Sequence, residues 1–226
     1  MARPRSAGYD DQREMILARA AELFAQRGYA STSMNNVAEA CGVTKPTLYH
    51  YYRDKYDLLV TIAEDYVTRL AELVHEIEVE ALPAHERLRA LILRVVAEYA
   101  GAQNAHRVLT VDVRFLEPDD KARVLAHERK VVAGFARAIG EMRPEMATAE
   151  LTKPLTMLLF GMVNWMFTWL KRDGELDYET MAPIVADLFF GGVHRVDVPG
   201  LKTPDTRAEL PGAQPAPSLS HDGDTR

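Results

Sequence analysis

Residues 32–55, TSMNNVAEACGVTKPTLYHYYRDK, constrain the fold most. Their capping residues, glycine and proline fit two short helices joined by a tight turn. Ser33 can cap the first helix, since its hydroxyl can accept a hydrogen bond from an amide of the first turn. Gly42 can adopt the left-handed conformation that the turn needs. Thr44 can cap the second helix, and Pro46 in its first turn loses only an amide that has no helical partner. The segment is therefore predicted to be a helix-turn-helix.

The second helix of this segment, residues 44–51, divides its side chains between two faces. Leu48 would face the core together with Tyr51 or Tyr52. The outer face would carry Lys45, Thr47, Tyr49 and His50. The free amides and the positive dipole end at the start of a helix suit the approach of phosphates and base edges. The pattern therefore predicts a recognition helix for double-stranded DNA.

The rest of the chain reads as helix, because apolar residues recur at spacings of three and four and no stretch alternates with a period of two. A first helix is expected over 9–27, ended by Gly28, and a long helix over 55–80. Proline and glycine then divide the remaining sequence into helices near 84–102, 106–115, 118–142, 152–171 and 177–193. We therefore predict an all-α protein.

The composition fits a DNA-binding module attached to an acidic body. The chain has a net charge of −6, but residues 1–56 hold eight basic side chains against six acidic ones. The single cysteine, Cys41, has no partner for a disulfide and is interpreted as a small buried apolar residue. The start lacks the apolar run of a secretory signal, and the most apolar stretch, 157–170, is shorter than the roughly 20 residues of a membrane span. A cytoplasmic protein without a membrane partner is expected.

Two other classes of function stay open beside a DNA-binding regulator. An enzyme with a helix-turn-helix, such as a recombinase, would need a positioned nucleophile or a carboxylate–metal cluster. The chain has neither an HExxH motif nor a glycine-rich phosphate loop, so no catalytic residue, metal ligand or cofactor is predicted. An architectural protein would bind DNA without any effector. The sequence favours a regulator that is not an enzyme.

The motifs of the helix-turn-helix resemble the DNA-binding domain of the TetR (tetracycline-repressor) family. The resemblance rests on AAELFAQRGYASTSM, VAEACGV and TKPTLYHYY, followed by D-K-x-x-L-L at residues 54–59. It covers about residues 10–60, and Tyr52 stands where most members have phenylalanine. It implies a transcriptional regulator, usually a repressor, that binds a palindromic operator as a homodimer and is released by a small-molecule effector.

The resemblance also implies which residues meet the DNA. The DNA-binding set consists of Ser33, Thr44, Lys45, Pro46, Thr47, Tyr49, His50 and Lys55. Lys45 is the expected specificity residue, because lysine can donate to guanine O6 and N7. Tyr49, His50 and Lys55 would contact phosphates. Arg3 and Arg5 would either enter the adjacent minor groove or belong to a disordered basic terminus.

The body of the chain is similar to the ligand-binding and dimerisation domain of the same family. Its last two helices are apolar on more than one face, and in the family this pair forms a four-helix bundle with its mate. The alternative is a buried hairpin in a monomer. The resemblance further implies an effector pocket walled by the middle helices. Its candidate lining residues are Tyr66, Tyr99, Arg107, Val111, Arg114, Phe115, Phe160, Asn164 and Trp165.

The stretch 161–193 also resembles TetR-type regulators of fatty-acid, sterol and aromatic-acid breakdown, phenylacetyl-CoA regulators among them. The implied effector is an acyl-CoA thioester. Its phosphates would meet Arg94, Arg107, Arg114 and Lys130, unless these charges belong to solvated helix faces. The expected organisation is a flexible basic arm (1–8), a helix-turn-helix domain (9–55), a helical ligand-binding and dimerisation domain (56–196) and a disordered tail (197–226).

Overall fold

The computed structural model describes residues 7–170 and 176–196, and in these residues it contains helices and no strand. The expectations for residues 1–6 and for the tail, 197–226, lie outside the described residues. The helices are α1 (Ala7–Arg27), α2 (Met34–Cys41), α3 (Lys45–Tyr51), α4 (Lys55–Val79), α5 (Ala84–Gly101), α6 (Gln103–Asp112), the 3-10 turn η1 (Val113–Phe115), α7 (Pro118–Met142), α8 (Pro144–Thr148), α9 (Thr152–Trp169) and α10 (Tyr178–Val193). The predicted all-α class is confirmed.

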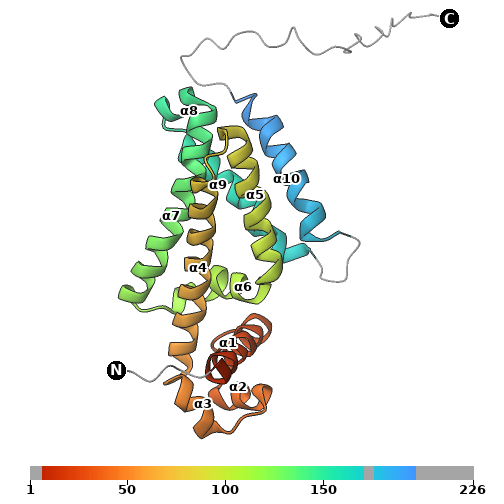
Figure 1. Ribbon diagram of the computed structural model, residues 1–226. Helices are drawn as coiled ribbons and strands as arrows, with labels where there is room; N and C mark the ends of the chain where they lie inside the picture. The colour runs from red at the N-terminus through yellow and green to blue at the C-terminus, as the bar shows by residue number, and fades with distance from the viewer. Residues whose placement is uncertain (1–6, 171–175, 197–226) are drawn as a thin grey trace, which may run out of the picture. The chain divides into compact units, whose positions relative to one another are not determined.

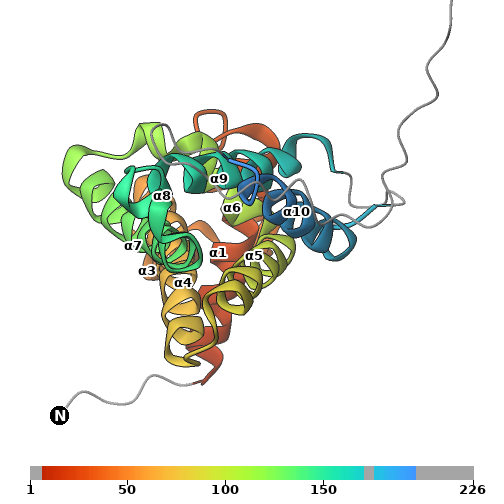
Figure 2. The same cartoon turned by 90° about the horizontal axis from the view of Figure 1, so that it is seen from above.

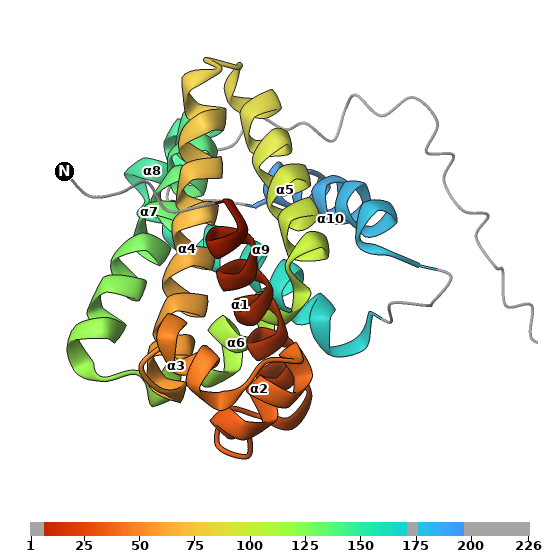
Figure 3. The ribbon, with the colours of Figure 1, turned by 60° about the horizontal axis from the view of Figure 1, so that its bottom comes forward.

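Helices α1, α2 and α3 pack together at one end of the described chain (Figure 1). In α1, the stripe that contains Ile16, Ala20 and Phe24 is buried, as its spacing predicted. Gly28 ends the helix with φ of 83°, in the left-handed region that glycine favours. Figure 3 shows how α1 then lies beside α4 and α6, so the small N-terminal domain rests directly on the body.

Helix α4 runs from this small domain into the body, where it packs against α5, α6 and α7 (Figure 1). Asp54 caps it, because its carboxylate accepts a hydrogen bond from the amide of Asp57 at 2.8 Å. The helix has 25 residues, which at 1.5 Å per residue corresponds to about 37 Å. A single rigid element therefore joins the two parts of the chain.

The remaining helices complete the body around α4. Figure 2 shows α10 beside α5 and α7 beside α4, and α9 packs on α7. The helix expected over 106–115 begins at Gln103 and ends as a 3-10 turn. Short α8 was not expected, because Pro144 was interpreted as a break, whereas proline also fits the first turn of a helix. No helix within 7–170 and 176–196 has both the length and the apolar character of a membrane span.

Gly134 sets the closeness of α4 and α7. A Cβ atom at this position would overlap the Cγ1 atom of Val74 on α4. We expect Gly134→Ala to lower the free energy of unfolding by about 1–3 kcal/mol, the usual cost of overpacking, measured by urea unfolding at fixed protein concentration. Val74→Ala in the same chain should restore most of the loss. Gly101→Ala is the control, because a Cβ there meets no atom within 4 Å; equal effects of the two glycine changes would contradict this explanation.

Candidate functional site

The turn between α2 and α3 is built as its sequence predicts. The Ser33 hydroxyl accepts a hydrogen bond from the Asn36 amide at 3.2 Å, and the Ser33 amide donates to Asn36 Oδ1 at 3.0 Å. Thr44 Oγ1 accepts from the Thr47 amide at 3.3 Å. Gly42 lies in the left-handed region with φ of 64°. These caps satisfy amides at both helix starts and fix the angle between the helices.

The inner face of α3 is anchored to α1. Leu48 is fully buried, and of the two tyrosines that follow, Tyr52 is the one inside the core. Its hydroxyl donates to the carbonyl of Arg13 at 3.3 Å, and burial raises the pKa of Tyr52 to about 12. Tyr51 is half-buried and donates to Gln12 Oε1 at 2.9 Å. Two tyrosines thus hold the helix in one orientation.

The outer face of α3 presents a compact set of polar and aromatic groups. Lys45, Pro46, Tyr49 and His50 are exposed, and Thr47 is half-buried. The Lys45 ammonium lies 5.9 Å from the centre of the Tyr49 ring. The His50 ring meets the Tyr9 ring edge-on at 5.9 Å between centroids. The predicted recognition helix therefore presents one lysine on its outer face, beside two aromatic side chains.

Two residues of the DNA-binding domain, Lys55 and Cys41, have surroundings that the sequence did not indicate. The Lys55 ammonium donates to the carbonyls of Tyr29 at 2.8 Å and Ala30 at 3.4 Å, and it lies 4.3 Å from the Tyr29 ring centre. Its donors tie the start of α4 to the α1–α2 loop, and the phosphate contact that the resemblance implied stays a prediction. Cys41 is half-buried, not buried, because it lies at the end of α2, and burial raises the pKa of its thiol.

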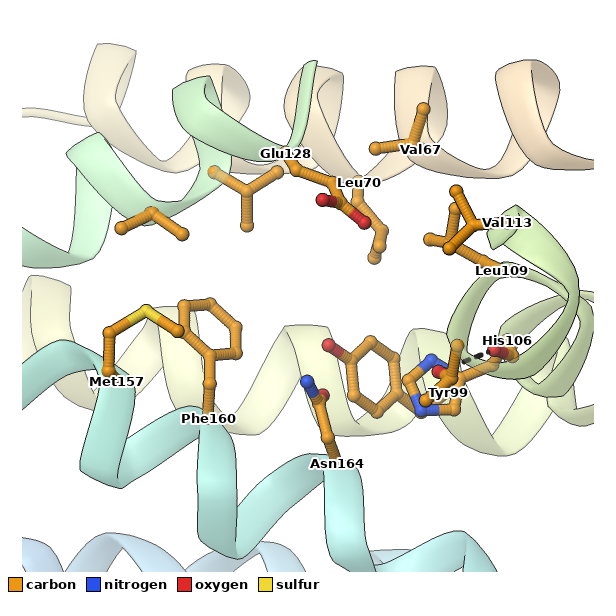
Figure 4. Close-up of a pocket in the computed structure, with 13 residues that line it drawn as sticks. Val67, Leu70, Tyr99, His106, Leu109, Val113, Glu128, Met157, Phe160 and Asn164 are labelled. Carbon is orange, nitrogen blue, oxygen red and sulfur yellow. Dashed lines mark hydrogen bonds between the residues drawn. The ribbon is translucent and has the colours of Figure 1, made fainter. Parts of the chain in front are cut away.

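A cavity of about 280 Å³ lies in the body among α4, α5, α6, α7 and α9 (Figure 4). Its wall is mostly aliphatic and aromatic, as is usual for small-molecule sites. The lining residues are Val67, Leu70, Tyr99, His106, Leu109, Thr110, Val113, Glu128, Val131, Val132, Met157, Phe160 and Asn164. Among the described residues, no group of three or more His, Cys, Asp or Glu side chains is placed to hold a metal ion.

A buried aromatic cluster forms one end of the cavity. The His106 ring stacks on Tyr99 with 3.9 Å between centroids, and its Nδ1 atom lies 3.3 Å from the Tyr66 hydroxyl. Burial lowers the pKa of His106 to about 4, so the ring is neutral at physiological pH. Its Nε2 atom, like Asn164 Oδ1, is buried without a hydrogen-bond partner in the described part of the chain. Such atoms carry a cost that a bound ligand can remove.

Within 7–170 and 176–196, Glu128 is the only charged side chain that lines the cavity. It extends from α7 toward the cavity, opposite Asn164 of α9 (Figure 4). Burial raises the pKa of its carboxyl group, and the described residues provide it with no ion pair or hydrogen bond. The cavity therefore combines an apolar wall with a carboxyl group that has no counterion.

The sequence-predicted pocket residues divide into two groups. Tyr99, Phe160 and Asn164 line the cavity, and Tyr66 lies behind it against His106. The other five lie outside it: Arg107, Val111, Arg114, Phe115 and Trp165.

Four of these five are each one residue beyond a residue that lines the cavity: His106, Thr110, Val113 and Asn164. One step along a helix turns a side chain by about 100°, so these four predicted residues lie on the helix face next to the one that lines the cavity. Of the residues expected at CoA phosphates, Arg94 instead pairs with Glu80 at 2.9 Å. Lys130 faces a different hollow, between α4 and α7. Glu128 was missed because a lone glutamate on a helix usually faces solvent.

Comparison with known proteins agrees with both halves of this architecture. Residues 16–62 match the bacterial regulatory proteins of the tetR family, and residues 81–193 match the tetracyclin repressor-like C-terminal domain. The chain belongs to the TetR family.

Particular relatives extend over most of this TetR-family chain. The fatty acid metabolism regulator protein of Bacillus subtilis is 22% identical over 186 residues, 79% of this chain and 94% of that protein. A TetR-family transcriptional regulator from Bordetella parapertussis is 31% identical with a TM-score of 0.74, covering 78% and 93% of the two chains. The crystal structure of AibR with isovaleryl coenzyme A and operator DNA is 27% identical with a TM-score of 0.67, covering 78% and 97%.

The last two helices of this TetR-family chain leave large apolar side chains uncovered. Leu158, Trp165 and Trp169 are exposed on α9, and Ile184 and Leu188 are exposed on α10. Trp165 is 67% exposed and Leu188 is 64% exposed. Their spacings of four and seven residues place them on one stripe of each helix. Exposed apolar stripes of this kind are typical of interaction surfaces.

A contact between α6 and the α1–α2 loop links the cavity to the DNA-binding domain. The backbone amide of Tyr29 donates to the buried Asp112 carboxylate at the end of α6. The Tyr29 ring packs on Phe115 with 5.3 Å between centroids. Since α6 and η1 also supply His106 and Val113 to the cavity wall, one short element contacts both places.

Proposed function

We propose that this chain is a cytoplasmic transcriptional repressor that binds a palindromic operator as a homodimer and leaves it when a small molecule fills the cavity. The observation that carries the proposal is the shared element α6–η1, which borders the cavity and holds the loop before the helix-turn-helix. A protein that only packages DNA needs no such cavity, so this arrangement favours a regulator.

The DNA contacts follow from the exposed face of α3. Lys45, Pro46 and Thr47 at its first turn meet base edges, and Tyr49 and His50 beside them meet phosphates. Ser33 and Thr44 hold the two helix starts in position and can approach the backbone from there. Phosphate contacts fix the register of the helix, while base contacts carry sequence information.

The homodimer forms through α9 and α10. Their exposed apolar stripes pair with the same stripes of a second copy, as in an isologous four-helix interface. Two recognition helices then meet successive major grooves, about 34–36 Å apart. The effector is an acyl-CoA thioester. Support for this class comes from the relatives, one of which regulates fatty acid metabolism while another was solved with isovaleryl coenzyme A and operator DNA.

Release of the operator follows from a shift between two arrangements of α4 and α6. A ligand in the cavity presses on His106 and Val113, and α6 transmits the displacement through Asp112 to the loop at Tyr29. Lys55 carries the same displacement to the start of α4, since it bonds that loop. A coupling of about 1–3 kcal/mol between ligand and DNA changes operator affinity about 5- to 150-fold.

The Asp112 contact gives a prediction for this coupling. Asp112→Ala removes the acceptor for the Tyr29 amide and should reduce the effector-induced loss of operator affinity by about 1 kcal/mol, roughly fivefold. Effector affinity itself should change little, because Asp112 does not line the cavity. Operator binding by fluorescence anisotropy and effector binding by calorimetry measure the two quantities. Asp112→Asn keeps an acceptor oxygen and should retain most of the coupling; loss of coupling in both variants would contradict the stated role.

The test of the proposed function starts with selection of binding sites from random DNA by the full chain. A regulator should enrich a short palindrome, protect it in footprinting and release it when phenylacetyl-CoA or octanoyl-CoA is added. Protection without sequence preference would indicate an architectural protein. Cleavage of supercoiled DNA in the presence of divalent metal would indicate an enzyme. If the protein binds a palindrome and neither thioester makes it dissociate, only the proposed effector class is refuted.

A further inference from the structure

We propose that the cavity selects the neutral thioester form of an acyl group, and that Glu128 excludes the corresponding free carboxylic acid. This inference rests on the proposed function and names the residue that determines its ligand specificity. It follows from the placement of one carboxyl group in a wall that has no positive charge.

Among the described residues, the wall of the cavity contains no lysine or arginine. The neighbouring cations of α7 point elsewhere: Arg129 donates along its own helix to the carbonyl of Leu125 at 3.1 Å, and Lys130 borders the hollow on the α4 side. A carboxylate ligand would therefore enter an apolar space without a counterion and next to a second carboxylate. Both desolvation and like-charge repulsion oppose this.

A thioester avoids both costs, because it is uncharged and has only a carbonyl acceptor. The wall holds groups that can donate to it. The Tyr99 hydroxyl extends into the cavity (Figure 4), and His106 Nε2 carries the proton when Tyr66 donates to Nδ1. Asn164 contributes an amide on the facing helix. The polar part of the wall thus matches a carbonyl better than an anion.

The size of the cavity indicates the length of the acyl group. A cavity of about 280 Å³ lies at the lower end of the roughly 300–1,000 Å³ usual for small-molecule sites, so it suits a small acyl group. Octanoyl and phenylacetyl groups have this size. The rest of a CoA thioester is far larger, so it must lie outside the cavity.

The experiment uses three small probes that share a benzyl group and end in a neutral thioester, an anionic carboxylate or a cationic amine. These are the N-acetylcysteamine thioester of phenylacetic acid, sodium phenylacetate and phenethylamine, titrated calorimetrically into the full chain at pH 8. We expect the thioester to bind at least about tenfold more tightly than the acid. In Glu128→Gln, which keeps the shape of the side chain, acid affinity should rise at least about tenfold while thioester affinity stays within about threefold.

Glu72→Gln is the matched control, since it removes an exposed carboxylate from α4 beside the other hollow and should leave the preference unchanged. An equal thioester-to-acid ratio in the original chain and in Glu128→Gln would overturn the proposal, as would failure of the thioester to bind. The proposal would also be overturned if the amine bound more tightly than the thioester and this preference disappeared in Glu128→Gln. That result would assign a cationic ligand to the cavity. If the probes behave as expected but CoA thioesters do not release the operator, only the effector part of the proposed function fails.

Discussion

Leu188→Glu should convert the protein into a monomer and lower its operator affinity at least about 100-fold, or roughly 2.7 kcal/mol. The side chain lies on the exposed apolar stripe of α10, and in a two-fold interface the substitution occurs twice. Two carboxylates would then be buried without partners, which costs several kcal/mol. A monomer holds one recognition helix, so the second half-site no longer contributes to affinity. Sedimentation velocity and operator anisotropy at one protein concentration measure both effects.

Val79→Glu provides the matched control for this substitution. Val79 ends α4 and is 69% exposed, so the change adds the same charge to an uncovered apolar position away from α9 and α10. It should alter neither the dimer nor operator binding, and circular dichroism should show unchanged helix content for both variants. A dimeric Leu188→Glu protein would place the interface elsewhere and would leave the exposed tryptophans of α9 without an explanation.

The parts of the fold that depend on neighbouring residues were predictable from the sequence. Ser33, Gly42 and Thr44 act within one turn of the chain, through a cap or a backbone conformation that few residue types adopt. The same local logic placed the buried stripe of α1 and the start of α4. Pro144 shows the limit of this logic, because a proline fits both a break and the first turn of a helix, and only the surrounding packing decides.

The cavity depends on how helices far apart in the sequence cross, and this information is not local. On α6 the sequence predicted Arg107, whereas His106 lines the cavity; on α9 it predicted both Asn164, which lines the cavity, and Trp165, which is exposed outside it. Helix α6 packs on α1 with one face and borders the cavity with another, so its apolar pattern does not show which face lines the cavity. Lys55 illustrates the same point, since its partner carbonyls belong to a loop 25 residues earlier.

Lys45→Ala should weaken operator binding by about 1–3 kcal/mol at each half-site, or about 2–6 kcal/mol for the dimer. The lysine is exposed in the first turn of α3, and it is the only lysine or arginine of that helix, so no neighbour on α3 can replace its donors. If it reads a base, affinity for random DNA should fall much less than affinity for the selected palindrome. Competition binding with both DNAs measures this specificity ratio.

Two matched variants separate base reading from general electrostatics. Lys130→Ala removes an exposed lysine from α7, far along the chain from the recognition helix, and should leave the specificity ratio unchanged. Tyr49→Phe removes the hydroxyl that we propose contacts a phosphate, and it should weaken binding to palindrome and random DNA alike, because phosphates carry no sequence information. If Lys45→Ala also weakened both DNAs equally, Lys45 would be a phosphate contact. Sequence would then be read by Pro46 and Thr47, which have no charge. The selected palindrome should in that case contain thymine at the position that faces them, because apolar side chains contact its methyl group.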